Sequence, residues 1–97
     1  GWDCAEAIEA FLAKLTAAAP ADGAAAIRQR GSVTTISEDA TVWLLNNVVL
    51  ALKFANPEYE DTEYSIKDLL EQIRAEGVAV FDWPNWVQAR FAEERGR

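Results

Sequence analysis

The sequence has no histidine, no methionine and a single cysteine, Cys4. Without histidine there is no imidazole general base, and without Cys or His clusters there is no conventional zinc site. A lone cysteine also excludes an intramolecular disulfide. The chain shows no phosphate-binding loop, no glycine-rich dinucleotide fingerprint and no serine-centred elbow. We therefore expect a protein that is not an enzyme and needs no cofactor, and a small-ligand binder or enzyme is the last alternative.

Long hydrophobic runs and an excess of basic residues are also missing. The longest apolar run, residues 42–55, is interrupted by Asn46, Asn47 and Lys53, so it is too short and too polar to cross a bilayer. No charged-then-apolar leader is visible, and we expect a cytoplasmic protein that does not contact a membrane. The 16 acidic residues exceed the 9 basic ones, for a net charge of −7. That charge disfavours direct binding of nucleic acid and favours basic partners.

What the sequence does contain predicts a mainly α fold. A chain of 97 residues forms one domain, 1–97, and its many alanines with only five glycines favour helix. Capping residues are expected at Asp3, Asp22, Ser37 and Ser65, and ends are expected before Pro20, at Gly31, before Pro57 and at Gly77. These signals, with Pro84 in a first helical turn, predict about five helices, over residues 4–18, 22–30, 38–55, 66–76 and 83–95.

Two short segments are more typical of strands. Residues 33–36 read Val, Thr, Thr, Ile, and β-branched side chains of this kind suit an extended backbone. Residues 78–81 form a second apolar segment after Gly77. We expect the two segments to pair as a small two-stranded β-ribbon beside the helices.

The most acidic segment is the loop of residues 58–64, called here the acidic loop. Four carboxylates, those of Glu58, Glu60, Asp61 and Glu63, alternate with the rings of Tyr59 and Tyr64. A calcium site is disfavoured because the spacing of ligands in a calcium-binding loop is absent, and nothing fixes two carboxylates as an acid–base pair. The loop either faces water or docks on the Arg and Lys residues of a partner.

The last helix carries the most unusual composition. Trp83, Trp86, Val87, Arg90 and Phe91 fall within one arc of that helix, so Arg90 lies one turn beyond Trp86 and can stack on its indole. One interpretation is that this arc closes the core, as aromatic stripes usually do. The other is that Trp86 and Arg90 form an exposed anchor pair for a partner.

Two further residues carry expectations. Cys4 falls on the apolar stripe of the first helix, so we expect a buried structural cysteine rather than a nucleophile. Asn47 projects among apolar neighbours, where an unpaired amide costs about 1–3 kcal/mol. Its partner is either within the chain or another Asn47 across a homodimer seam.

Together these features predict a protein-binding module whose acidic surface docks on a basic site of a protein partner. The expected contact residues are Glu58, Tyr59, Glu60, Asp61, Glu63 and Tyr64, with Glu38, Asp39, Trp86 and Arg90. If that basic site normally holds nucleic acid, the domain acts as an inhibitor by mimicking it, as small acidic inhibitors from mobile genetic elements do; the analogy is one of charge and size. The alternative is a homodimeric assembly protein that associates through helix 38–55 and the Trp-rich C-terminal helix.

Overall fold

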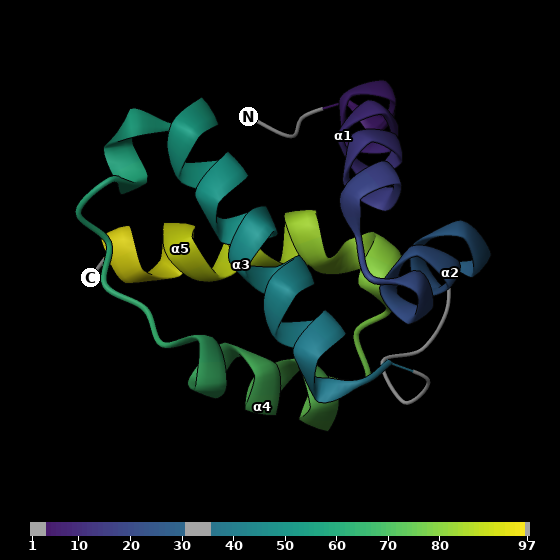
Figure 1. The fold of residues 1–97 in the computed structure, drawn as a ribbon. Coiled ribbons are helices and arrows are strands. Elements are labelled where there is room, and N and C mark those ends of the chain that lie inside the picture. The colour runs from purple at the N-terminus through teal and green to yellow at the C-terminus, as the bar shows by residue number, and fades with distance from the viewer. Residues whose placement is uncertain (1–3, 31–35, 97) are drawn as a thin grey trace.

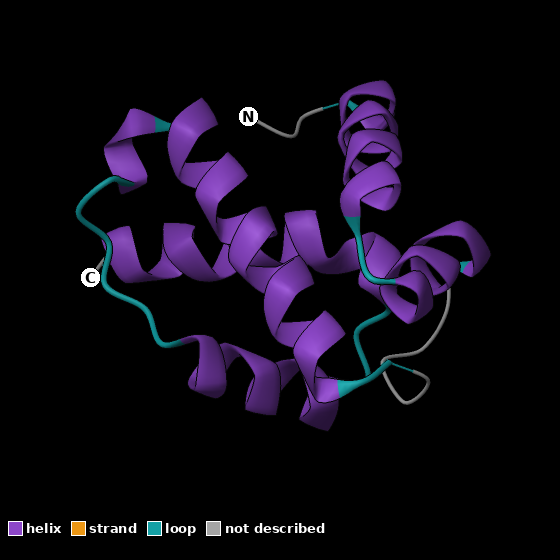
Figure 2. Cartoon of the chain, in the orientation of Figure 1, coloured by secondary structure: helices purple, strands orange, loops and turns teal. Residues whose placement is uncertain are grey.

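A computed structural model describes residues 4–30 and 36–96. This part of the chain contains five α-helices and two short 3₁₀ helices, and no strand (Figure 2). The α-helices are α1 (Ala5–Ala18), α2 (Ala21–Gln29), α3 (Glu38–Ala55), α4 (Ile66–Glu76) and α5 (Trp83–Arg95), and the 3₁₀ helices are η2 (Pro57–Tyr59) and η3 (Val80–Asp82). The predicted mainly α fold of five helices is confirmed.

Several helix ends follow from local chemistry. The hydroxyl oxygen of Ser37 accepts a hydrogen bond from the amide of Ala40 at 3.2 Å, and that of Ser65 accepts one from the amide of Asp68 at 3.4 Å. These hydroxyl oxygens accept hydrogen bonds from first-turn amides, which have no carbonyl partner within the helix. Gly77 ends α4 with a φ of 66°, a left-handed conformation that glycine adopts without strain. The predicted starts of α3 at Ser37 and of α4 at Ser65, and the predicted end of α4 at Gly77, are therefore confirmed.

Helix α3 is the centre of the molecule and contacts α2, α4, α5 and η2 (Figure 1). Its buried positions Leu44, Leu45, Val49 and Leu52 have no exposed surface. Trp83 of α5 is also fully buried, and its indole N–H donates to the carbonyl of Val78 at 3.1 Å. This coverage on several sides accounts for the buried apolar residues of α3.

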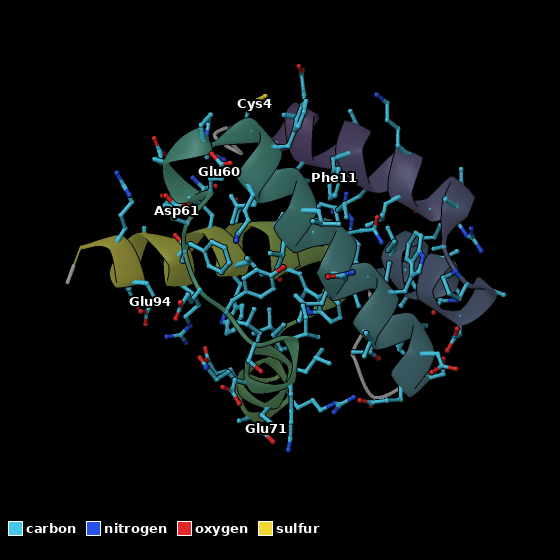
Figure 3. The ribbon with its side chains drawn as sticks, turned by 60° about the vertical axis from the view of Figure 1, so that its left-hand side comes forward. Cys4, Phe11, Glu60, Asp61, Glu71 and Glu94 are labelled. Atoms are coloured by element: carbon cyan, nitrogen blue, oxygen red, sulfur yellow. The ribbon has the colours of Figure 1, made fainter. Side chains whose placement is uncertain are left out.

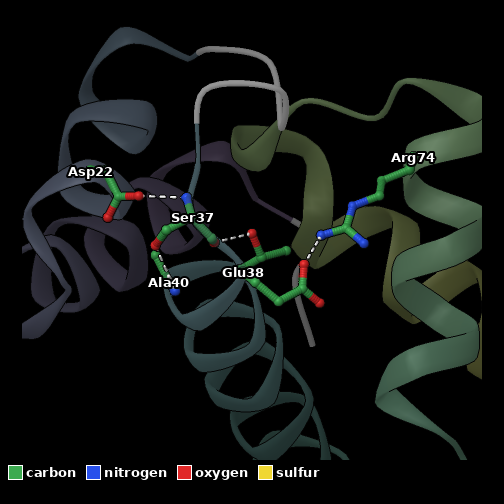
Figure 4. Close-up of polar contacts among 6 residues, drawn as sticks. Asp22, Ser37, Glu38, Ala40 and Arg74 are labelled. Atoms are coloured by element: carbon green, nitrogen blue, oxygen red, sulfur yellow. Dashed lines mark hydrogen bonds and ion pairs between the residues drawn. The ribbon is translucent and has the colours of Figure 1, made fainter.

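The start of α2 and the start of α3 are tied together, which the sequence did not indicate. Asp22 was predicted to cap α2, but Pro20 is the N-cap and Asp22 lies in the first turn. Its carboxylate instead accepts a hydrogen bond from the amide of Ser37 at 2.5 Å (Figure 4). At the other end of α2, the left-handed position is Arg30, with a φ of 53°; Gly31 lies outside the described residues.

The predicted β-ribbon is not found. Residues 78 and 79 are irregular, and residues 80–82 form η3. Their amides bond locally, since Val78 N–H donates to the carbonyl of Ile73 and Asp82 N–H to that of Ala79. Val80 is buried, so this apolar segment fills the core from a 3₁₀ turn rather than from a strand. Of the other half, residues 33–35 lie outside the described part, and Ile36 is in a bend.

Candidate protein-binding surface

The acidic loop leaves the C-terminal end of α3 and is held by a lysine of that helix. Lys53 Nζ donates to the carbonyl oxygens of Glu60 at 3.2 Å and Thr62 at 2.9 Å. The same ammonium lies 4.6 Å from the centre of the Tyr64 ring, a cation–π distance. Lys53 thus binds backbone oxygens and a ring, and in the described part of the chain it forms no ion pair with a carboxylate of the loop.

Both tyrosines of the loop pack inward on Phe91 of α5. The Tyr59 ring meets the Phe91 ring edge-on with a centroid distance of 6.0 Å, and the Tyr64 ring lies 5.7 Å from it. Tyr59 is buried, whereas Tyr64 is 36% exposed. Tyr59 was expected to contact a partner, and in this structure its burial against Phe91 makes it a support for the loop. Tyr64 remains partly accessible.

The four loop carboxylates are accessible to solvent. Glu58, Glu60, Asp61 and Glu63 are all exposed. Within residues 4–30 and 36–96, no basic side chain pairs with any of them. The loop thus presents four carboxylates that form no ion pair within the described residues, from a backbone that is held by hydrogen bonds and ring packing.

Carboxylates from α4 and α5, which were not among the predicted contact residues, extend this surface. A groove of about 410 Å³ separates the loop from these helices. Its acidic lining comprises Glu63, Asp68, Glu93 and Glu94. A smaller hollow of about 270 Å³ brings Asp61 and Glu63 beside Glu94 and Arg95. Figure 3 shows Glu60, Asp61 and Glu94 on the same side of the molecule. Only tertiary packing brings α5 to the loop, so no local signal could reveal this extension.

Glu38 and Asp39 do not belong to the same patch. They begin α3, whereas the acidic loop follows its end, and 18 helical residues span about 27 Å. Glu38 is also paired with Arg74 at 2.5 Å (Figure 4). The expectation that these residues assist the loop as one patch is corrected by this separation, although Asp39 is exposed.

The C-terminal aromatic arc divides into a buried and a half-buried part. Trp83, Val87 and Phe91 are buried, which confirms that the arc closes the core. Trp86 and Arg90 are half-buried, and the Arg90 guanidinium lies 4.9 Å from the Trp86 ring, as the spacing predicted. Glu76 then joins the pair, accepting from Trp86 Nε1 at 3.2 Å and from the Arg90 guanidinium at 2.5 Å.

This pairing alters the expected role of the C-terminal helix. The polar groups of Trp86 and Arg90 are already satisfied by Glu76, and Arg90 also contacts Glu93 at 3.4 Å. Arg90 lines the groove beside Tyr64 and Phe91. Of the two tryptophans in this helix, Trp83 has no exposed area and so is not available to the alternative dimer surface.

Two other expectations are decided by the helix geometry. Cys4 is exposed, because α1 begins at Ala5 and Cys4 is its N-cap, outside the apolar stripe. The prediction of a buried cysteine is wrong for that reason, and the expected Asp3 cap lies outside the described residues. Asn47 donates its amide to the carbonyl of Trp43 at 2.8 Å, so its partner is within the chain.

The described residues offer neither a metal centre nor a transmembrane segment. Among residues 4–30 and 36–96, no three His, Cys, Asp or Glu side chains are grouped so that they could hold a metal ion. Over the same residues, every helix is too short or too polar to cross a membrane. Comparisons with protein-family models, curated proteins and solved structures gave no match to this chain.

Proposed function

We propose that this protein is a non-enzymatic binding module whose acidic loop docks on a basic site of a protein partner. The observation that carries the proposal is the set of four exposed loop carboxylates with no basic partner in the described chain. Charges left unpaired in the free protein are available to guanidinium and ammonium groups, which form the strongest hydrogen bonds to carboxylates.

The rigid support of the loop also favours binding. Lys53 holds two loop carbonyls, and Tyr59 and Tyr64 pack on Phe91. A loop that is already ordered loses less conformational entropy when it binds, so more of the interaction free energy appears as affinity. If the partner's basic site is one that binds DNA or RNA, this protein inhibits it by competition.

A matched pair of charge variants tests the proposal. One variant, Glu60→Gln with Asp61→Asn, neutralises the loop; the control, Glu71→Gln with Asp82→Asn, makes the same two changes elsewhere on the exposed surface. Glu71 lies on a different side of the molecule from Glu60 and Asp61 (Figure 3). The probe is a fluorescent peptide rich in Lys and Arg and free of apolar residues, with affinity measured by anisotropy in 50 mM NaCl.

We expect the loop variant to bind the basic peptide about five- to thirtyfold more weakly, since it removes two exposed charges and each exposed charge pair contributes about 0.5–1 kcal/mol. The control should bind within twofold of the original chain. Both proteins should then be used to capture partners from cells at low salt. Equal weakening by the two variants would show that net charge alone is responsible and would refute docking through the loop.

A further inference from the structure

Helix α3 exposes a line of apolar side chains that ends beside the acidic loop. Val42 is 39% exposed, Leu50 is 55% exposed and Phe54 is 91% exposed. Their spacings of eight and four residues place them along one side of the helix, on a row whose remaining position is the exposed Asn46, and we call the three apolar residues the α3 stripe. An almost fully exposed phenylalanine on the central helix of a small domain is unusual, because the other faces of α3 are buried.

The position of Phe54 joins the stripe to the charged surface. Phe54 follows Lys53, whose ammonium holds the carbonyls of Glu60 and Thr62. Helix α3 ends one residue after Phe54, and η2 begins at Pro57. The aromatic ring is therefore within about one helical turn of a loop that carries four free carboxylates. Apolar aromatic anchors surrounded by polar groups are the usual composition of an interface core.

Carboxylates also lie at the other end of the stripe. Asp39 is exposed in the first turn of α3, three residues before Val42, and Glu58 and Glu60 are exposed beyond Phe54. A second copy of this chain packed along the stripe would bring carboxylates together in either orientation. In a parallel pair, loop faces loop, and in an antiparallel pair, loop faces Asp39. Such like-charge contacts oppose self-association of a chain with a net charge of −7.

The same arrangement suits an occupant of opposite charge. We propose that the α3 stripe receives a basic amphipathic helix of the partner protein. Phe54 and Leu50 meet its apolar face, and the acidic residues at the two ends of α3 meet its Lys and Arg residues. In this kind of recognition the docking helix presents apolar anchors at spacings of three, four and seven residues, and Leu50 and Phe54 are four residues apart on α3. This inference depends on the proposed function and specifies the form of its partner.

Two synthetic peptides of equal charge separate the apolar contribution from the charged one. The first is a helical peptide of about 20 residues with Leu at positions i, i+3, i+4 and i+7 and Lys or Arg elsewhere. In the second, Gln replaces each Leu. We expect the unmodified protein to bind the Leu peptide at least tenfold more tightly than the Gln peptide in 150 mM NaCl.

The substitution Phe54→Ala should remove most of this preference while leaving the salt dependence of binding unchanged. Its thermal midpoint should stay within about 2 °C of the original, because a side chain that is 91% exposed adds little to the core. The loop variant with Glu60→Gln and Asp61→Asn should weaken binding of both peptides and lower the salt dependence, while keeping the preference for Leu.

The failures are distinguishable. If Phe54→Ala retains the full preference for the Leu peptide, the stripe is not the docking face, although the charge effect of the loop still stands. If the original chain sediments as a dimer that Phe54→Ala converts to a monomer, a second copy covers the stripe and the inference is overturned. If neither peptide binds with any dependence on salt, the proposed function fails as well.

Discussion

Asp22 shows how one carboxylate can connect two helices through a backbone amide. Its hydrogen bond from the Ser37 amide lowers the pKa of its carboxyl below the usual value of 3.8. The ionised form is therefore favoured in the folded state. A group with a lowered folded pKa stabilises the protein above its unfolded pKa, and that stability is lost as the pH falls through the folded value.

The substitution Asp22→Asn should therefore destabilise the protein at pH 7 and have a smaller effect at pH 2.5, because the stability contributed by the ionised aspartate falls once the pH is below the ordinary pKa of the carboxyl. Urea unfolding at pH 7, 4 and 2.5 measures the difference directly. The gap between the two proteins should close below about pH 4. A gap that stays constant over this range would mean that the contact with Ser37 does not depend on ionisation.

Gly77 is a second residue whose role depends on its backbone. Its φ of 66° is strained for any residue with a Cβ atom, although no atom would clash with one there. The substitution Gly77→Ala should lower the free energy of unfolding by about 1 kcal/mol. Gly96, at a φ of −79°, is the matched control, and Gly96→Ala should change stability by less than about 0.3 kcal/mol in the same denaturation experiment. Equal effects would show that the left-handed position is not the cause.

At the scale of elements, the helix boundaries were predictable because their signals are local. Ser37, Ser65 and Gly77 act within one turn of their own position, and the structure places α3 and α4 where those residues indicated. Among the predicted caps that lie within the described residues, Asp22 is the exception. Its carboxylate bonds to an amide 15 residues away, a contact that depends on how α2 and α3 meet.

The prediction of a β-ribbon was wrong because it considered the strand propensity of these residues without their tertiary contacts. Val78 and Val80 favour an extended backbone, but the amide of Val78 completes the end of α4 and Val80 is needed in the core. Tertiary packing decided the outcome. The burial of Tyr59 was equally inaccessible from the sequence, because it depends on where Phe91 of α5 lies. The four loop carboxylates were identifiable because a run of acidic residues can be recognised in the sequence whatever the fold.

The link between α3 and the acidic loop is testable through Lys53. The substitution Lys53→Met keeps most of the aliphatic stem but removes the donors to the carbonyls of Glu60 and Thr62. We expect hydrogen exchange of the Thr62 amide, which is bonded to the Tyr59 carbonyl, to increase about tenfold. The loss in global stability should be about 1 kcal/mol.

The control for this experiment is Lys67→Met, which removes the same charge from an exposed position near the start of α4. Exchange at Thr62 should be unchanged in that protein. If both variants accelerate exchange equally, the net charge rather than the tether controls the loop.

At the scale of the whole molecule, the unpaired carboxylates oppose folding by mutual repulsion. The chain carries a net charge of −7, and four of its negative charges are concentrated in the acidic loop. Salt shortens the range of this repulsion from about 30 Å at 0.01 M to a few ångströms at 1 M. Raising NaCl from 20 to 500 mM should therefore increase the free energy of unfolding by about 0.5–1 kcal/mol.

The loop variant with Glu60→Gln and Asp61→Asn should be more stable than the original chain at 20 mM NaCl and should gain less from added salt. Thermal unfolding monitored by circular dichroism at both salt concentrations provides the comparison. A salt response identical in the loop variant and in the Glu71→Gln, Asp82→Asn control would place the repulsion elsewhere on the surface.

Lys53 holds the backbone of the acidic loop without using the acidic side chains of the loop. Its ammonium contacts main-chain oxygens at residues 60 and 62, and every amino acid supplies such an oxygen. The outward side chains at positions 58, 60, 61 and 63 can therefore be exchanged without altering the anchor. A molecule built in this way can change its binding preference by substitution at these positions alone, and the loop is a natural place to graft or diversify a recognition sequence.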